Sequence, residues 1–188
     1  MFMSRFLGTV FLLFIISMKV EAQGIRAVLG DDSVRFIYIT EAWGQEIGSL
    51  DVEAGVLSTG TDNTLVHLGA LVQNRNLDST LRLAIGARGY YASINNTNAT
   101  FLSFGGDLVY TPDNWRGIGL GASYFIAPSF TSFTGAESFS EYSVSIHYQI
   151  TPQGQIAFGY HKQEVQLESE LNVRTIEKGA FVGLRFDF

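Results

Sequence analysis

Apolar and polar side chains alternate one by one along most of the chain after residue 22. The segment 142–150 is the clearest case, because one of its two sides consists of Tyr142, Val144, Ile146, Tyr148 and Ile150. Successive side chains of a β-strand point to opposite faces, so such a segment forms a strand with one apolar face. No window in this part keeps the i, i+3, i+4, i+7 apolar stripe of an amphipathic helix. The pattern therefore predicts an all-β fold.

Residues that favour turns divide the chain into eight alternating segments. The expected strands are 47–58, 64–74, 79–92, 100–111, 116–127, 139–151, 154–166 and 174–188. They are longer than the roughly five or six residues of globular strands, and they suit the roughly 9–11 residues of a tilted transmembrane strand. The pattern predicts an antiparallel up-and-down transmembrane β-barrel of eight strands.

The connections between these segments are expected to alternate in length. Tight turns rich in Asn, Asp, Pro and Gly are expected at 74–78, 111–114 and 151–154. Longer loops are expected at 59–63, 93–99, 127–138 and 167–173. Short turns at one end and longer loops at the other are typical of outer-membrane barrels.

The segment 33–40 leaves the number of strands open, because it also alternates like a strand. Adding it alone gives an odd number. Adding 25–30 as well, joined by a turn at Asp31 and Asp32, gives ten strands. We favour eight membrane strands with 25–41 as an accessory strand or amino-terminal segment, and we keep ten as the alternative.

The first 22 residues have the layout of a secretory signal peptide. Arg5 supplies a positive start, 6–16 is an apolar run, and 20–22 offers the small residues that a signal peptidase recognises. The run is too short for a membrane-anchoring helix. We expect residues 1–22 to be cleaved and residues 23–188 to form the barrel domain.

Composition excludes several other classes of protein. The chain has no Cys, which excludes a disulfide scaffold, a Cys-based zinc site and a Cys-anchored lipoprotein. Its formal net charge of −6 argues against nucleic-acid binding, which calls for a basic patch. The remaining destinations are the periplasm, secretion and the outer membrane.

A secreted β-sandwich or a lipocalin-like soluble barrel has the same alternation, with the apolar face turned inward. Three features favour a membrane barrel instead. The polar faces are rich in Gly and Ser, aromatic residues such as Tyr110 and Trp115 cluster at segment ends, and the chain ends on a strand. We therefore expect a monomer in the cell outer membrane, in contact with its lipid and lipopolysaccharide.

The last strand, 179–188, resembles the carboxy-terminal recognition strand of outer-membrane barrels. The residues that match its pattern of alternating apolar positions with a final Phe are Val182, Leu184, Phe186 and Phe188. The resemblance implies that the barrel assembly machinery binds this strand during insertion.

Most of the mature chain resembles the YfaZ family of outer-membrane proteins. The stretches that carry this resemblance are 77–92, 101–133, 141–162 and 179–188. They include a Gly-rich strand, an Ala-Pro-Ser sequence after an aromatic strand, and a Gly-Tyr-His-Lys sequence. The resemblance implies a fold and a location, but no catalytic motif, cofactor or activity.

Charged residues of both signs fall on the inward side of the expected strands. They are Asp51, Glu53, Arg82, Arg88, Asp107, Arg185 and Asp187. Buried charges need partners, and an eight-strand barrel has little free space, so we predict a salt-bridge network that mostly plugs the lumen. The alternative is a narrow polar path or ligand site, which gains weight with ten strands.

His147 and His161 are also expected to face the lumen, on adjacent strands and within reach of each other. Ser143 and Ser145 share the face of His147, so a lipid-modifying enzyme is a distant alternative. No His-x-Ser pattern is present and no further metal ligands are evident, so we predict a structural role and no metal.

Phe130 and Phe133 lie among Ser and Thr in the expected loop 127–138. Such aromatic residues either contact a ligand or lipopolysaccharide at the surface, or fold over the barrel mouth. The sequence as a whole predicts a non-enzymatic barrel of structural, surface-interaction or narrow-pore type, with a ten-strand small-solute porin as the alternative.

Overall fold

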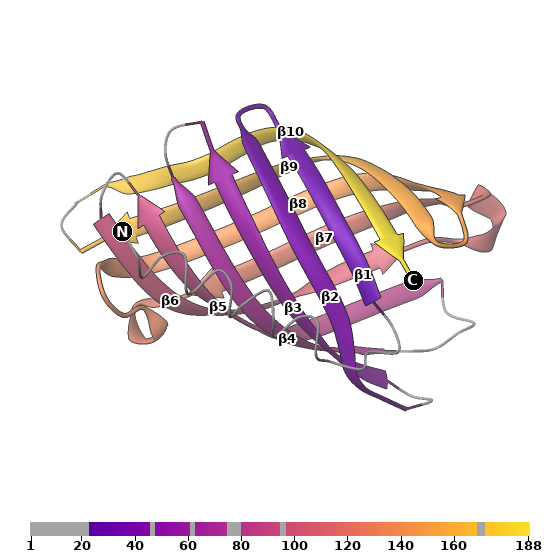
Figure 1. Ribbon diagram of the computed structural model, residues 1–188, viewed down its shortest axis with the longest axis horizontal. Helices are drawn as coiled ribbons and strands as arrows, with labels where there is room; N and C mark the ends of the chain where they lie inside the picture. Colours follow the sequence, from indigo (N-terminus) through magenta and orange to yellow (C-terminus); the bar gives the residue numbers. More distant parts are fainter. Residues whose placement is uncertain (1–22, 46–47, 61–62, 75–79, 95–96, 169–171) are drawn as a thin grey trace, which may run out of the picture.

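The chain folds into a closed barrel of ten antiparallel strands, in which each strand pairs with its neighbours in sequence and β1 pairs with β10 (Figure 1). The computed structural model describes residues 23–45, 48–60, 63–74, 80–94, 97–168 and 172–188. The expected signal peptide, 1–22, lies outside the described residues and stays a prediction. The strands are β1 (Gln23–Gly30), β2 (Ser33–Gln45), β3 (Gly48–Thr59), β4 (Thr64–Asn74), β5 (Leu81–Ile94), β6 (Thr97–Tyr110), β7 (Ile118–Ala127), β8 (Ala136–Thr151), β9 (Gly154–Leu167) and β10 (Val173–Asp187).

The favoured number of eight strands is wrong, and the ten-strand alternative is correct. Residues 25–41 belong to β1 and β2, which are full members of the wall rather than an accessory segment. The pairing of β1 with β10 runs from Gly24 opposite Asp187 to Gly30 opposite Phe181. Without β1 and β2, the edges of β3 and β10 would be left unpaired, which a strand in lipid does not tolerate.

The expected difference between the two ends of the barrel is also wrong. We call the end where β1 begins and β10 ends the terminal end, and the opposite end the distal end. At the distal end β5 continues to Ile94 and β6 begins at Thr97, so most of the expected loop 93–99 is strand. At the terminal end the connection between β6 and β7 includes a short 3-10 helix, η1 (Asp113–Trp115). Longer and shorter connections therefore occur at both ends.

Apolar side chains cover the outside of the barrel. In β4, for example, Leu68 and Val72 are 56% and 63% exposed, whereas the alternate residues Leu65 and Leu71 are buried. Each strand contributes to this outer apolar surface, through Leu29, Phe36, Val56, Leu68, Ile85, Phe104, Leu120, Ile146, Phe158 and Leu184. A soluble sandwich or lipocalin-like barrel buries its apolar face, so this arrangement contradicts both alternatives.

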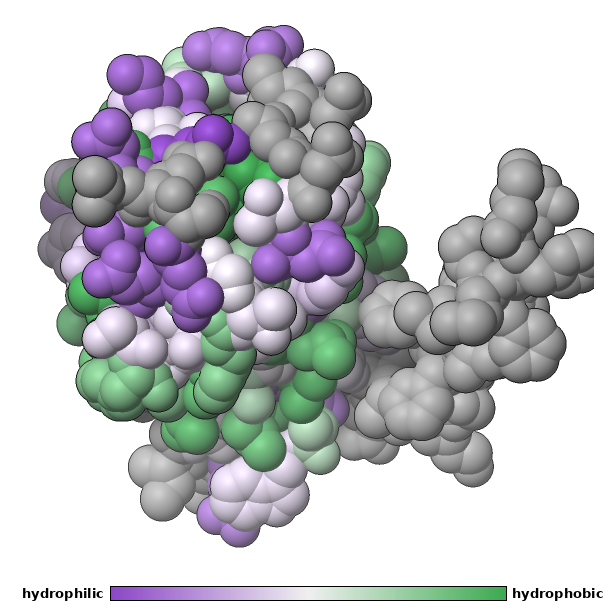
Figure 2. Space-filling view, turned by 90° about the vertical axis from the view of Figure 1, so that its left-hand side faces the viewer, coloured by the Kyte–Doolittle hydropathy of each residue, from purple (hydrophilic) through white to green (hydrophobic). Residues whose placement is uncertain are grey.

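Polar residues gather at the distal end instead (Figure 2). Figure 2 looks onto the distal end, where hydrophilic residues face the viewer, and hydrophobic residues lie along the wall below them. Near the terminal end the rings of Tyr110 and Trp115 meet edge to face, with their centroids 6.0 Å apart.

No helix among the described residues is long and apolar enough to span a bilayer.

The main apolar core lies inside the barrel at its distal end. It contains residues from β3 to β10, namely Leu57, Leu65, Tyr90, Ala92, Ile94, Ala99, Phe101, Ala127, Ala136, Phe139, Val165, Leu167 and Ile176. At its centre the ring of Phe101 stacks on those of Tyr90 and Phe139, at centroid distances of 5.1 and 4.3 Å. We call this set the distal plug; its members come from eight of the ten strands.

Candidate functional site

The inward side chains of β5 pass through three successive layers of the lumen. Arg82 lies near the terminal end, Arg88 lies in the middle, and Tyr90 and Ile94 belong to the distal plug. The lumen is therefore apolar at the distal end, ionic in the middle and hollow at the terminal end. Alternation on one long strand places all three kinds of residue on the same face.

Arg88 is the centre of the first ion-pair cluster in the middle layer. Its guanidinium donates hydrogen bonds to Glu53 and, at 3.2 Å, to Asp107. Its guanidinium carbon also lies 3.6 Å from the ring centroid of Phe125, a cation–π contact. Arg88 and Glu53 are both about 4% exposed, so each needs the other to compensate the cost of burying its charge.

Arg35 of β2 is the centre of a second cluster. Its guanidinium is 2.5 Å from Glu141 of β8 and 3.2 Å from Glu177 of β10. The hydroxyl of Tyr90 donates a hydrogen bond to Glu141 at 2.6 Å, while its ring packs in the distal plug. Tyr90 therefore joins the ionic layer to the apolar plug.

His161 extends this second cluster. Its Nε2 lies 2.8 Å from Glu177 Oε1, and its ring stacks on Phe181 with 5.2 Å between centroids. Ser33 donates its hydroxyl hydrogen to the same carboxylate oxygen of Glu177 and not to His161. This arrangement lacks the contact between nucleophile and base that acyl transfer needs.

The expectation that His147 and His161 lie within reach of each other is wrong. In the register of β8 and β9, His161 is opposite Ser143, whereas His147 is opposite Ala157. The positions of the two residues are therefore four residues apart along the strand direction, an offset of about 13 Å between their Cα atoms. His147 instead forms a hydrogen bond of 2.9 Å with Thr111.

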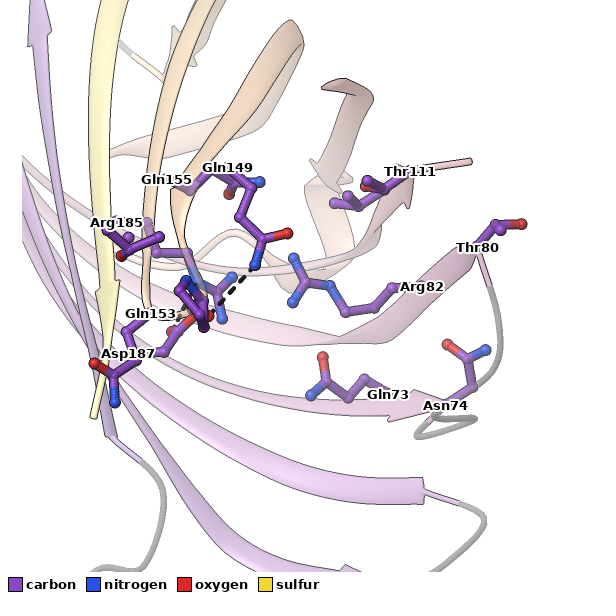
Figure 3. Close-up of a pocket in the computed structure, with 14 residues that line it drawn as sticks. Gln73, Asn74, Thr80, Arg82, Thr111, Gln149, Gln153, Gln155, Arg185 and Asp187 are labelled. Atoms are coloured by element: carbon purple, nitrogen blue, oxygen red, sulfur yellow. Dashed lines mark hydrogen bonds and ion pairs between the residues drawn. The ribbon is translucent and has the colours of Figure 1, made fainter. Parts of the chain in front are cut away.

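A polar cavity of about 360 Å³ opens at the terminal end. We call it the terminal cavity. Figure 3 shows Arg82 reaching into it, with Gln73 and Gln149 nearby and Arg185 and Asp187 on the opposite wall. Arg185 donates to Asp187 at 2.9 Å.

Two smaller cavities of about 130 and 50 Å³ lie deeper in the lumen. We call them the central and the side cavity. Arg82 and Arg185 line all three cavities, and Arg26 lines the central and the side cavity. Arg35 and Arg88 also line the central cavity, so the hollow part of the lumen is lined by arginines from four strands.

The seven lumen charges expected from the sequence lie in two places. Glu53, Arg88 and Asp107 form the first ion-pair cluster of the middle layer. The others, Asp51, Arg82, Arg185 and Asp187, line the terminal and side cavities. Asp51 accepts a hydrogen bond from Ser49 at 2.9 Å.

Sequence reasoning missed Arg26, Arg35, Glu141 and Glu177 in the lumen. Arg26 and Arg35 lie in the segment that was expected to be an accessory. Glu177 lies directly after a β-bulge, on the side where the alternation continues unbroken to Arg185 and Asp187. Glu141 and Glu177 both had a usable signal, because Glu141 has the same parity as Ser143 and His147 on β8, and Glu177 has the same parity as Arg185 and Asp187 on β10.

The remaining expected residues lie on the outside of the barrel. Phe130, in the short helix η2 (Ser129–Thr131), and Phe133 are 81% and 56% exposed, so both rings are available for contact at the surface. In β10 and just beyond it, Val182, Leu184, Phe186 and Phe188 are all exposed. Among the described residues, no group of three His, Asp or Glu side chains is placed to hold a metal ion.

Comparison with known proteins gives a match to one family model, described as YfaZ precursor, over residues 3–188. No curated protein matches the sequence. Among solved structures, the barrel is similar to the outer membrane channel DcaP of Acinetobacter baumannii, with 9% sequence identity and a TM-score of 0.46. The match covers 87% of this chain and 54% of the channel, so this chain spans about half of that protein's length.

Proposed function

Because the chain belongs to the YfaZ family, whose model matches nearly all of it, we propose that it is an outer-membrane β-barrel of structural or surface-interaction type. In this proposal the side chains of the distal plug and the middle layer close the lumen, and the barrel is not an open pore. The chain acts on no substrate.

The apolar outer surface supports the membrane location. Outward side chains such as Phe36 and Ile146 are 52% and 57% exposed, and comparable residues occur on every strand. In water such a continuous apolar surface would cause aggregation, whereas in a bilayer it faces lipid tails. The closed sheet satisfies the backbone hydrogen bonds that lipid cannot.

The proposal that the lumen is closed rests on one observation, the distal plug. Its thirteen residues come from eight strands, and each is at most 5% exposed. The rings of Tyr90, Phe101 and Phe139 pack against one another within this set, and in this proposal they interrupt the polar path along the lumen. Moving ions through this apolar layer would require them to lose their hydration without compensation.

The experiment is single-channel recording of the purified barrel in planar lipid bilayers. We expect the wild type to give no long-lived conductance steps. The double variant Phe101→Ala/Phe139→Ala, which empties the centre of the plug, is expected to give them. The matched control, Phe130→Ala/Phe133→Ala, removes two exposed rings and is expected to stay silent like the wild type. Steady conductance steps from the wild type would contradict a closed lumen.

The hollow terminal half of the lumen favours a second candidate function, narrow passage of small solutes. The three cavities share Arg82 and Arg185, so polar space extends from the terminal end to the middle layer. Passage requires the plug to open. The same recording separates the two candidates, because a channel conducts in its wild-type form.

A further inference from the structure

Two arginines face each other directly across the seam that closes the barrel. Arg26 of β1 and Arg185 of β10 are cross-strand partners in the register of these strands. Directly opposed side chains have their Cβ atoms about 5 Å apart, and like charges in this position are destabilising. Asp187 pairs with Arg185, but no ion pair or hydrogen bond to a described residue engages the guanidinium of Arg26.

Arg82 of β5 adds a third guanidinium to the same space. It lines all three cavities together with Arg185, and Figure 3 shows its guanidinium in the open part of the terminal cavity. Like Arg26, it forms no ion pair or hydrogen bond with the part of the chain that the structure describes.

The nearby carboxylates are already engaged with other groups. Glu53 and Asp107 bind Arg88, and Asp51 accepts a hydrogen bond from Ser49. The donor groups of Arg26 and Arg82 are therefore left for water or for a solute. This contrasts with the middle layer, where Arg35 and Arg88 each contact two carboxylates.

Besides Arg82, Arg185 and the Asp187 carboxylate that Arg185 binds, the terminal cavity is lined largely by neutral groups that donate and accept hydrogen bonds. They include the amides of Gln73, Gln149, Gln153 and Gln155 and the hydroxyls of Thr80 and Thr111. The volume of about 360 Å³ is within the range of small-molecule sites. Guanidinium groups bind carboxylates and phosphates through paired hydrogen bonds, and neutral donors around them suit the remaining oxygens.

We infer that the terminal half of the lumen is a binding site for a small solute that carries a phosphate or carboxylate group, held by Arg26, Arg82 and Arg185. The solute enters from the terminal end, because the ionic layer and the distal plug lie behind the site. Its negative charge offsets the repulsion between Arg26 and Arg185. The inference depends on the barrel fold and not on whether the lumen conducts.

Isothermal titration calorimetry on the folded barrel in detergent tests this site. Inorganic phosphate and citrate are the two probes, and sodium chloride at equal ionic strength is the reference. We expect saturable binding of at least one probe at one site per barrel, with no saturable heat from chloride. Arg82→Gln is expected to weaken this binding at least about tenfold, since it removes a charged hydrogen-bond donor.

Arg116→Gln is the matched control, because Arg116 lies in the exposed turn after η1 at the same end and lines none of the three cavities. It removes the same charge and is expected to bind the probe like the wild type. Should Arg82→Gln fail to fold, Arg82→Lys keeps the charge without the planar fork and is expected to bind several-fold more weakly.

Absence of saturable binding of both probes to the wild type overturns the inference. Equal weakening by Arg116→Gln and Arg82→Gln also overturns it, because the effect is then one of net charge. Calorimetry in detergent does not depend on conductance, so failure of the binding site and failure of the closed-lumen proposal give different results.

Discussion

Arg88 and Glu53 form their buried ion pair across an intervening strand. Glu53 of β3 and Arg88 of β5 are both in register with Gly69 of β4, so the glycine lies between them. A Cβ atom at position 69 would lie 2.8 Å from Cγ of Glu53 and 3.1 Å from Cγ of Arg88. The two charged side chains meet because Gly69 has no side chain of its own.

Gly69→Ala is therefore expected to destabilise the barrel, because the added methyl group forces Glu53 and Arg88 apart. The expected loss is about 1–3 kcal/mol, typical of overpacking. The measurement is the temperature at which the folded form disappears on a semi-native gel. Gly89→Ala is the matched control, since a Cβ there meets only the carbonyl oxygen of Leu68 at 3.9 Å. Equal effects of the two variants would contradict the steric explanation.

Arg88→Ala is expected to lower the unfolding temperature more strongly than Gly69→Ala. It leaves the carboxylates of Glu53 and Asp107 in the lumen without their main partner, at a cost of about 3–5 kcal/mol. Thermal unfolding in detergent measures the loss. The double variant Arg88→Met/Glu53→Gln removes both charges and is expected to lose less than Arg88→Ala. An unchanged unfolding temperature for Arg88→Ala would show that the lumen charges are not structural.

Val144→Arg tests which solvent the outer surface contacts. Val144 lies near the middle of β8 and is 54% exposed, so in a membrane its side chain faces the bilayer centre. A lipid-facing Arg near the midplane costs about 2–4 kcal/mol, and one near the interface costs about 0–1 kcal/mol. Val173→Arg, at the start of β10, is the matched control for the interface. Unfolding of the barrel in lipid vesicles is the measurement, and equal stability of the two variants would contradict a membrane-spanning wall.

Phe188→Ala tests the role proposed for the last residue. Phe188 is 61% exposed and lies just beyond β10, so its removal is expected to change stability little. If the barrel assembly machinery binds this residue, the amount of folded protein in cells is expected to fall several-fold, while refolding in detergent is unchanged. Phe133→Ala removes another exposed ring and is the control. Normal amounts of Phe188→Ala in the outer membrane would contradict the assembly role.

The barrel was predictable from the sequence because alternation is a local property of each strand. Counting every second residue along β4 to β10 is enough to identify most of the outward apolar side chains. The same count places Arg82, Arg88 and Asp107 in the lumen. The number of strands was not predictable in this way, since β1 and β2 alternate like the others but nothing local shows that they close the wall. Closure depends on the pairing of β1 with β10, which is a long-range contact.

The composition of the ionic layer was predictable only in part. The pairing of Arg35 with Glu141 joins residues 106 positions apart in sequence, and no local pattern specifies it. The bulge between Thr175 and Glu177 changes the parity of β10, so alternation counted back from Phe188 gives the wrong side for Ile176, which is buried in the distal plug. Alternation also assigns a residue to a face of the sheet without giving its position along the strand. For this reason His147 and His161 were wrongly expected to meet.

Gel mobility of the protein from fractionated cells, with and without boiling, tests the central claim most directly. An outer-membrane barrel sediments with the outer membrane and, as a compact folded form, migrates differently before boiling than after it. We predict both results for this chain. Protein that stays in the soluble fraction and shows the same mobility before and after boiling would contradict the account.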